Sequence, residues 1–550
     1  MISPSLVLWA LQRLGLALGG SMVLFCVYQT LELLYAELTS PLRDLPGPPS
    51  ENMFFGNFRE LFSSDSSAVQ QKWTEKYGKT IKYKGIMGIT RLYTTDLKAV
   101  NHFLVNTQTY QKPAAAIYNL TRILGEGVLV VEGDAHKLQR KLLNPAFGPQ
   151  QIRELTEIFV EKSIQLRDRW IEEILKQTGK ESEGLPAKID GLSWLSRTTL
   201  DVIGLAGFNY KFDSLTDSPE KNELSEAFAV MFRTSTSLNP IAALRGLFPA
   251  LRFLPAPGDT ESGLASKTMF SIGAQLLADS KASNATQNEK SSHARDILSI
   301  LVHANSATDL SENQRLNDKD VLAQIPTFMV AGHETTSVAV TWALFALTQK
   351  RDIQDKLRDE LSTISTDNPT MDELNSLPYL DAVVRETLRL HAPVPSSMRA
   401  AVKDDVVPLS EPYVDKHGKK HETVTIKKGQ MIMIPIVPIN KSKDLWGDDA
   451  WEFNPDRWQN LPEAVSAVPS VWGNMMTFIG GPRACIGYRF SIIEMKALIF
   501  TLVRAFDFDL AVPAKDIVKK SSIVNRPVLL TASGKNENQM PLLVRIANSD

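Results

Sequence analysis

The sequence FIGGPRACIG, at Phe478–Gly487, surrounds Cys485, one of only 2 cysteines in the chain. Glycines at positions 480, 481 and 487 permit turns that a side chain would block, so the backbone can approach a metal closely. The stretch YRFSIIEMKALIFTLVRAF follows with apolar residues at helical spacing. It predicts a buried helix whose N-terminal dipole favours a thiolate at Cys485. The pattern thus predicts a thiolate metal ligand; the alternative is an ordinary buried core cysteine.

Five positions around this cysteine carry a resemblance to a known family. The spacing of Phe478, Gly481, Arg483, Cys485 and Gly487 matches FxxGxRxCxG, and on this motif the chain resembles the cytochrome P-450 family, whose haem-binding signature it is. The resemblance implies that Cys485 is the thiolate ligand of the iron of haem b, with Phe478 and Arg483 also at the cofactor. It further implies the P-450 fold, which is mainly α-helical with small β-sheets and is preceded here by a single N-terminal transmembrane helix.

The segment YLDAVVRETLRLH reads as a helix and contains ETLR, Glu386–Arg389. Residues at i and i+3 share a helix face, so Glu386 and Arg389 can form an ion pair, although most such pairs lie on solvated helices. The sequence FNPDRW adds Arg457 ahead of the cysteine. By the resemblance, these three residues form a structural Arg-Glu-Arg network that braces the haem-binding loop.

A long apolar helical run, Val321–Leu347, is interrupted by the polar residues of AGHETT, Ala331–Thr336. From the residues alone, this motif is either a polar kink satisfied within the core or a functional group inside the helix. The resemblance favours the second interpretation, because the matching family stretch crosses above the haem. Its alanine and glycine then make room for oxygen, and Glu334 and Thr335 are the acid and alcohol of a catalytic proton relay. His333 is assigned no role.

The sequence GDAHKLQRK places His136 and Arg140 at i and i+4, so both project from one helix face. The family usually has Trp at the first of these positions, but both side chains can donate a hydrogen bond to an anion. By the resemblance, His136, Arg140, Arg399 and Arg483 contact the haem propionates. For His136 a solvated helix face is the alternative.

The N-terminal stretch Leu14–Tyr28, LGLALGGSMVLFCVY, carries no charge. Extended back to Pro4, it reaches roughly the 20 residues that a bilayer requires. A cleaved signal peptide is the alternative, but a basic n-region is missing and no clear small-residue cleavage site follows. We predict a membrane anchor over residues 1–36, a linker over 37–50 with a stiff proline hinge at LPGPP, and a haem domain over 51–550.

The charge bias across the anchor is too weak to orient it. The cysteines allow no disulfide framework in the body of the chain, which indicates a reducing compartment. We therefore expect a single-pass protein of the endoplasmic reticulum membrane with its catalytic domain facing the cytosol. The sequons at Asn119, Asn284 and Asn440 would be glycosylated in the opposite orientation.

The 60 Lys and Arg residues nearly balance the 62 Asp and Glu residues, so the global charge does not indicate a nucleic-acid partner. Most of the chain reads as helix. Short β-like runs occur at Thr80–Thr95 and Ser396–Pro438, with a charged turn at Lys416–Lys420. Asp279–Asp296 reads as a solvated loop. Phe232–Phe253 is apolar but interrupted by prolines, and is either core or a surface that dips into the bilayer.

No flavin or dinucleotide motif occurs in the chain, so electrons must come from outside. The resemblance implies a monooxygenase that activates O2 with electrons from NADPH, delivered by NADPH-cytochrome P-450 reductase, and that hydroxylates or epoxidises its substrate. We expect the reductase to dock near basic residues on the cysteine side such as Lys137, Lys141 and Arg489. A haem-thiolate enzyme that rearranges a peroxide or dehydrates without external electrons is an alternative, but it needs no proton relay. A non-catalytic membrane-anchored haem sensor or carrier is another.

By family position the substrate pocket is mostly aliphatic, which predicts a bulky apolar substrate. Similarity to fungal membrane-bound members of the family favours a terpenoid of secondary-metabolite biosynthesis. Sterols, fatty acids and xenobiotics are the alternatives. The expected lining segments are Pro113–Leu124, Phe328, Met329, Val394–Met398 and Ser522–Val524.

Overall fold

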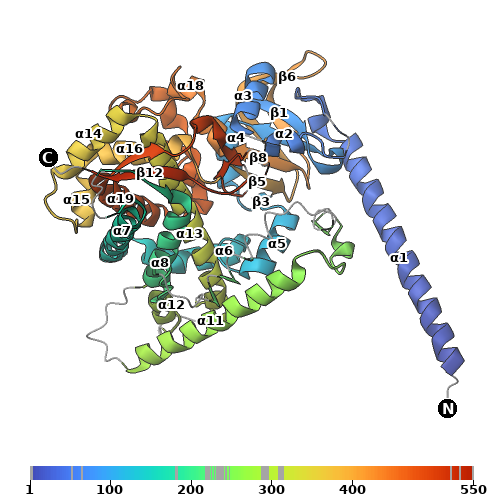
Figure 1. Ribbon diagram of the computed structural model, residues 1–550. Helices are drawn as coiled ribbons and strands as arrows, with labels where there is room; N and C mark the ends of the chain where they lie inside the picture. The colour runs from blue at the N-terminus through green and yellow to red at the C-terminus, as the bar shows by residue number, and fades with distance from the viewer. Residues whose placement is uncertain are drawn as a thin grey trace.

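The computed structural model describes residues 4–547, except residues 51, 53, 64–65, 180–183, 217–222, 225, 228–229, 231–240, 242–244, 247, 287–295, 307–314, 521–522, 532–533 and 535. The described chain forms a helical body, a β-rich region beside it, and one long helix, α1 (Pro4–Leu38), that projects from the β-rich region (Figure 1). This is the predicted fold class of helices with small sheets behind one N-terminal apolar helix.

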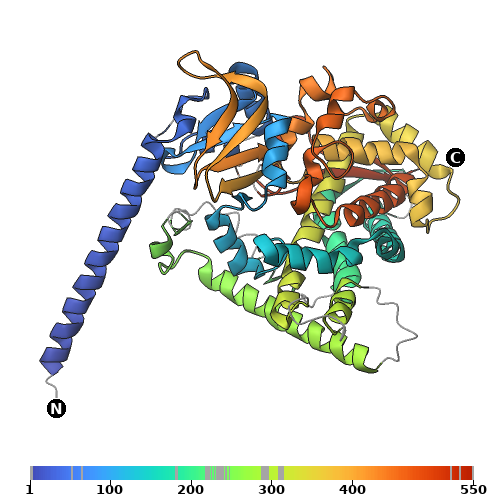
Figure 2. The same cartoon turned by 180° about the vertical axis from the view of Figure 1, so that it is seen from behind.

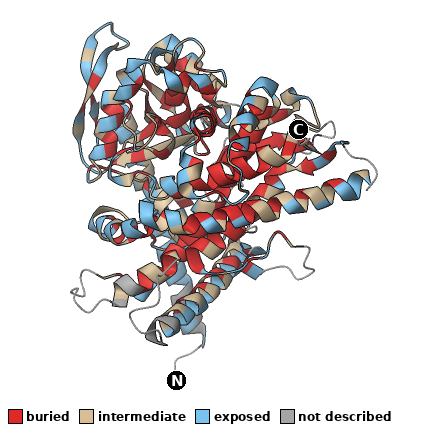
Figure 3. Ribbon diagram, turned by 90° about the vertical axis from the view of Figure 1, so that its left-hand side faces the viewer, coloured by how far each residue is buried: buried red, intermediate tan, exposed pale blue. Residues whose placement is uncertain are grey.

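Helix α13 (Asp318–Thr348) runs through the middle of the helical body. Asn317 caps its N-terminus by accepting the Asp320 N–H at 2.8 Å. Every residue from Thr336 to Leu344 is buried, as expected of a helix that is apolar all round. Figure 3 shows buried residues gathered along this central region and exposed ones on the outer faces of the surrounding helices.

Among the helices packed against α13 are α8 (Gly191–Phe208), α16 (Pro378–Leu390) and α19 (Tyr488–Ala505), and α19 in turn packs against α7 (Pro149–Thr178). The other helices lie around this core. They are α2 (Phe58–Ser63), α3 (Ser66–Tyr77), α4 (Leu97–Val105), α5 (Ala114–Leu124), α6 (Gly133–Leu143), α11 (Asp259–Thr286), α12 (Ile297–Ser306), α14 (Arg351–Ser362), α15 (Met371–Asn375), α17 (Ile436–Asn440) and α18 (Lys443–Trp446).

The β-rich region is built on a sheet with the strand order β1-β2-β8-β5-β3. Strands β1 (Thr80–Lys84) and β2 (Thr90–Thr94) pair antiparallel. Strand β8 (Met431–Pro435) runs parallel to β2 and antiparallel to β5 (Ser396–Ala401), which also pairs with β3 (Tyr110–Gln111). The smaller sheets are β6 (Asp405–Val414) with β7 (Lys420–Ile426), β4 (Ala187–Asp190) with β12 (Pro541–Ile546) and β9 (Phe506–Leu510), and β10 (Ile517–Lys520) with β11 (Arg526–Leu529).

Both predicted β regions are confirmed, and the charged turn joins β6 to β7 with Gly418 at φ +83°. The predicted loop Asp279–Asp296 is wrong in its first part, because α11 continues to Thr286. Alanine and lysine in this part support a helix, and no glycine or proline ends it. Much of Phe232–Phe253 lies outside the described residues; its end forms the 3-10 turn η4 (Pro249–Leu251), followed by an exposed Phe253.

Helix α1 contains a stretch, Gln12–Leu38, that is long and apolar enough to cross a membrane. None of its most apolar part is buried in the protein. The helix leaves the β-rich region as a straight extension (Figure 2). Length, composition and exposure are therefore compatible with the predicted anchor.

The end of α1 and the segment that follows it are packed against the β-rich region. Glu37 accepts the Thr90 N–H at 2.8 Å and pairs with the Lys84 ammonium at 2.5 Å, which fastens the last turn of α1 to β1 and β2. Leu42 and Leu45 are buried in the β-rich region. Helix α1 and the domain are thus joined by specific contacts.

The predicted glycosylation sequons differ in accessibility. Asn119 is exposed on α5, whereas Asn440 is fully buried and its side chain binds Thr477 at 2.9 Å and the Met476 N–H at 2.7 Å. Asn284 belongs to α11, and its side chain lies outside the described residues. Asn440 therefore cannot accept a glycan in the folded protein.

Candidate active site

The loop that carries Cys485 depends on glycines where other chain segments approach it. Gly481 has φ +76°, and a Cβ atom there would lie 2.8 Å from the carbonyl oxygen of Leu104 on α4. A Cβ atom on Gly480 would lie 2.5 Å from the carbonyl oxygen of Pro469. Only glycine accommodates such approaches. The Cys485 N–H donates to the Phe478 carbonyl at 3.0 Å and closes the loop just before α19.

The side chain of Cys485 is accessible at its surface, although the surrounding protein desolvates the thiol. Burial raises the pKa of the Cys485 thiol, whereas a hydrogen bond from the Gly487 N–H and the charge of Arg140 lower it. A backbone donor and a guanidinium beside the sulfur both stabilise a thiolate. The predicted position ahead of a buried helix is confirmed, since α19 begins at Tyr488.

The predicted propionate contacts meet in one cationic cluster. Arg483 donates to the Val131 carbonyl at 3.2 Å and pairs with Glu132, and Arg140 donates to the Ala484 carbonyl at 2.5 Å. Arg399, on β5, donates to Ser397 at 2.7 Å. Lys112 joins the cluster and binds Glu132 at 3.1 Å. We call Lys112, Glu132, His136, Arg140, Arg399 and Arg483 the cationic cluster.

Positive charges in this cluster oppose one another. Burial first, and then repulsion from Arg483, lowers the pKa of Arg399 to about 10 and that of Lys112 to about 8. The same two causes lower the pKa of His136 to about 4, so its imidazole is neutral at pH 7 and keeps one N–H donor. His136 and Arg140 were predicted to lie on one helix, and both lie on α6.

These residues fit a haem group. Glu132 is the only carboxylate in a cluster that also contains three arginines and a lysine, so there is room for further negative charge of the kind that two propionates carry. Nε of Arg483 is buried without a hydrogen-bond partner, as expected of a donor that serves a ligand. The nearby thiol supplies a soft donor for iron.

The AGHETT motif lies in the middle of α13, as predicted. Thr335 donates to the Ala331 carbonyl in the preceding turn at 2.7 Å, and Thr336 bonds Ser491 on α19 at 3.0 Å. A Cβ atom on Gly332 would lie 2.9 Å from the Ile203 side chain, so this glycine is needed where α13 crosses α8. The packing of α8 therefore gives the motif glycine a role besides the one expected from the resemblance.

Glu334 is buried and forms an ion pair with Arg526 on β11. Burial raises the pKa of its carboxyl group, and the guanidinium of Arg526 opposes that rise. We expected the carboxylate to order the Thr335 hydroxyl. In the structure the two side chains have different partners, because Thr335 bonds its own helix and Glu334 bonds β11.

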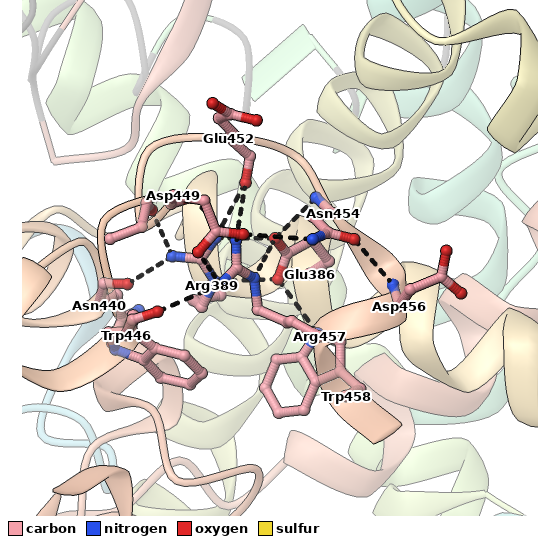
Figure 4. Close-up of polar contacts among 11 residues, drawn as sticks. Glu386, Arg389, Asn440, Trp446, Asp449, Glu452, Asn454, Asp456, Arg457 and Trp458 are labelled. Carbon is pink, nitrogen blue, oxygen red and sulfur yellow. Dashed lines mark hydrogen bonds and ion pairs between the residues drawn. The ribbon is translucent and has the colours of Figure 1, made fainter. Parts of the chain in front are cut away.

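Glu386, Arg389 and Arg457 form a buried network (Figure 4). Glu386 binds Arg389 at 2.7 Å and Arg457 at 2.9 Å, and it also accepts from the indole N–H of Trp458 at 3.1 Å. Arg389 donates to the Asn440 carbonyl at 2.9 Å and the Ala450 carbonyl at 2.6 Å. One buried carboxylate thus joins α16 to the segment that leads towards the Cys485 loop.

The expected pocket segments are only partly in position to line a cavity. Phe328 and Met329 are buried in the helical core, and Phe328 packs against Phe147 with ring centroids 5.2 Å apart. Their burial does not decide whether they also face an internal cavity, so the expectation that they line the pocket stays a prediction. Ser522 lies outside the described residues, while Ile523 is exposed. A cleft of about 840 Å³ between α3, α18 and residues 466–470 contains none of the predicted site residues.

The expected reductase contacts are on the surface. Lys137, Lys141 and Arg489 are exposed. Lys137 pairs with Asp134 one turn earlier on α6 at 2.9 Å, and Arg489 lies over the Tyr488 ring at 4.5 Å. Their exposure is compatible with docking of a partner.

Sequence reasoning missed three residues of this region. Lys112 and Glu132 belong to the cationic cluster, and Arg526 pairs with Glu334. Each depends on contacts between segments far apart in the chain, and none stands in a distinctive local motif. The change from the expected Trp to His at position 136 was the only sequence signal that the cluster differs from its family.

The geometry agrees with comparisons to known proteins. A family model described as Cytochrome P450 matches residues 46–532. Two relatives from Postia placenta, named cytochrome P450 monooxygenase 205 and 128, are 52% and 50% identical, each over 96% of this chain and 97% of its own. A ganoderic acid synthetase of Ganoderma lucidum is 36% identical over 89% of this chain and 92% of its own. On both its haem-loop geometry and these matches, the chain belongs to the cytochrome P450 family.

Proposed function

We propose that this protein is a membrane-anchored haem-thiolate monooxygenase that hydroxylates or epoxidises a bulky apolar substrate, a terpenoid of secondary metabolism. The observation that supports it best is the location of the Cys485 loop beside the cationic cluster, since Arg140 contacts both. A thiolate donor and an excess of positive charge together suit an iron porphyrin with two carboxylates.

When bound, haem supplies an iron that activates dioxygen. Cys485 would hold that iron, with the Gly487 N–H and Arg140 stabilising the thiolate charge. Phe478 is buried beneath the loop and packs against Trp472 with ring centroids 5.9 Å apart, which holds the loop in place. Arg140, Arg399, Arg483, Lys112 and the neutral His136 would donate hydrogen bonds to the propionates.

Proton delivery is assigned to Glu334 and Thr335. An acid and a hydroxyl on the same turn of α13 can pass protons from the protein to the reacting oxygen, and general acid catalysis of this kind is worth roughly 100- to 10,000-fold. Glu386, Arg389 and Arg457 act by holding the Cys485 loop and do not touch the reactants.

Electrons are proposed to come from NADPH through NADPH-cytochrome P450 reductase, docked on the exposed Lys137, Lys141 and Arg489. Charge-reversal variants of these residues with unchanged reductase affinity would contradict this docking site. Helix α1 supports a single-pass anchor, with the domain on the cytosolic side of the endoplasmic reticulum membrane.

The terpenoid assignment is supported by the Ganoderma lucidum relative, which is named a ganoderic acid synthetase and belongs to fungal secondary metabolism. The aliphatic residues expected around the pocket favour apolar ligands of any class. Sterols, fatty acids and xenobiotics therefore serve as the competing ligands in the test.

The test is a titration of the full chain in microsomes with a panel of terpenoids, sterols and fatty acids, followed in the haem Soret band. We expect a low-to-high-spin shift with terpenoids. A shift confined to another class would replace the terpenoid assignment. The reduced carbon monoxide spectrum should show a thiolate-type band that Cys485→Ser abolishes and Cys26→Ser retains, because Cys26 is the other cysteine and lies in α1.

A further inference from the structure

The proposed function gives no role to the ion pair between Glu334 and Arg526. Glu334 lies in the middle of α13, and Arg526 is the first residue of β11. Both Nε and Nη2 of the guanidinium bind Oε1 of the carboxylate. The Glu334 side chain is 7% exposed and that of Arg526 is 22% exposed. The pair is therefore largely shielded from water, where an ion pair is strong but costly to break.

The backbone that carries Arg526 is fixed to α13. The indole N–H of Trp342, on α13, donates to the Asn525 carbonyl at 2.9 Å. The Asn525 N–H donates to the Pro393 carbonyl at 2.8 Å, and its side chain donates to the Ala392 carbonyl at 3.2 Å. Position 526 is thus held from two sides, so the guanidinium is delivered to Glu334 by a rigid segment.

The pair leaves the two relay residues without contact. Thr335 donates to the Ala331 carbonyl at 2.7 Å, and the Glu334 carboxylate is bound to β11. A carboxylate held by a guanidinium is ionised and has no proton to give. Before Glu334 can hand a proton towards Thr335, its carboxyl group must leave Arg526 and be protonated.

We propose that Arg526 is a positioning residue for the relay acid, which keeps Glu334 ionised and turned away from Thr335 until the pair opens. This inference rests on the proposed role of Glu334 and Thr335 in proton delivery.

A purely structural tie between α13 and β11 is the competing explanation. Both explanations expect Arg526 variants to lose stability, so a stability measurement alone does not separate them. They differ in the protonation of Glu334. Burial raises the pKa of this carboxyl group and Arg526 opposes that rise, so loss of the guanidinium charge should raise the pKa of Glu334 further and favour its neutral form.

The first experiment is infrared spectroscopy of the full-length, haem-loaded protein at pH 7, following the C=O stretch of protonated carboxyl groups. We expect Arg526→Gln to gain one such band relative to the wild type. The band should be absent from Arg526→Lys, which keeps the charge, and from the double variant Arg526→Gln with Glu334→Gln. The matched control is Arg545→Gln, which removes the partner of Asp509 at 3.0 Å from another strand. No new band in Arg526→Gln would overturn the inference.

The second experiment measures NADPH consumption and peroxide release in the reconstituted system with the reductase and no added substrate. We expect the alkaline limb of the pH profile, where the relay acid loses its proton, to move to higher pH in Arg526→Gln and to return in Arg526→Lys. Peroxide released per NADPH should fall roughly tenfold in Arg526→Gln, because the relay acid keeps its proton. If the pH profile of Arg526→Gln matches that of the wild type, Arg526 only joins β11 to α13 and the proposed positioning role is wrong.

The two failures can be told apart. If Glu334→Gln leaves both the pH profile and the peroxide yield unchanged, the proton relay itself is wrong, and the role of Arg526 falls with it. If Glu334→Gln abolishes the alkaline limb while both Arg526 variants behave as the wild type, the relay stands and only the inference about Arg526 fails. If Arg526→Gln does not fold, Arg526→Met replaces it in both experiments, because it removes the charge, keeps most of the side-chain length and leaves Glu334 in place to be measured.

Discussion

At the residue scale, Glu386 shows how much can depend on one carboxylate. It is fully buried and binds Arg389 and Arg457, both of which are nearly inaccessible to solvent. Because its loss would leave two buried guanidinium groups without their counterion, we expect Glu386→Ala to destabilise the protein by about 3–5 kcal/mol. Denaturant unfolding and haem content of the purified protein measure this.

The control for that variant is an exposed pair with the same helical spacing. Arg169 and Glu172 pair at 2.7 Å with Glu172 64% exposed. Glu172→Ala should cost no more than about 0.5 kcal/mol, because water and salt screen such pairs. Equal costs for the two variants would show that the Glu386 network is not important for stability.

His333 gives the protein a sensitivity to acid. Burial, and secondarily Arg526, lowers its pKa from 6.5 to about 4, although a bond with the Met329 carbonyl opposes this. The unfolded chain therefore binds a proton below pH 6.5 that the folded protein does not bind until about pH 4, so stability falls as pH falls through this window.

The expected size of this effect is about 2 kcal/mol between pH 7 and pH 5, at about 1.4 kcal/mol per pH unit below 6.5. His333→Asn should remove that loss, so its stability relative to the wild type should improve as the pH is lowered. The matched control is His417→Asn, since the His417 side chain is 67% exposed. Parallel pH profiles for wild type and His333→Asn would contradict the prediction.

At the element scale, the crossing of α13 and α8 depends on Gly332. A methyl group there would meet Ile203 atoms at 2.9 Å. We expect Gly332→Ala to cost about 1–3 kcal/mol through overpacking. Gly207→Ala is the control, because a Cβ atom at that position meets Ile203 only at an ordinary 3.5 Å. The double variant Gly332→Ala with Ile203→Ala should lose less free energy of unfolding than the two single variants lose together, because the smaller side chain at position 203 makes room for the methyl group.

The junction between α1 and the sheet is a second element whose role can be tested. Glu37 binds the Thr90 N–H and the Lys84 ammonium. We expect Glu37→Ala to speed hydrogen exchange at the Thr90 amide and protease cleavage between residues 39 and 50, because the last turn of α1 loses its attachment. Glu32→Ala, which changes an exposed residue of the same helix, should leave both rates unchanged.

At the scale of the whole molecule, the features that could be predicted from the sequence are those that the spacing of neighbouring residues determines. The FxxGxRxCxG and ETLR motifs, the AGHETT helix and the paired strands at residues 80–95 all depend on neighbours within a few turns of chain. The contacts that join distant segments were not predictable. Lys112 reaches Glu132, and Arg526 reaches Glu334, only because the fold brings them together.

The burial of Phe328 and Met329 was also beyond local reasoning, because a helix presents all its faces and tertiary packing decides which of them are covered. The loop after residue 279 was predicted from composition alone, while α11 continues there on residues that form helix adequately.

In the proposed anchor role of α1, the junction at Glu37 would turn the thickness of the bilayer into a rotation of the enzyme. The stretch of α1 that is apolar enough to span, Gln12–Leu38, has 27 residues, which at about 1.5 Å per residue is roughly 40 Å, longer than a hydrocarbon core of about 30 Å. An embedded helix of that length relieves the mismatch by leaning, and it leans further in a thinner membrane. Because α1 is fastened to the sheet, the catalytic domain would roll with it, and lipid composition would decide how its faces are presented to the lipid surface and to the cytosol.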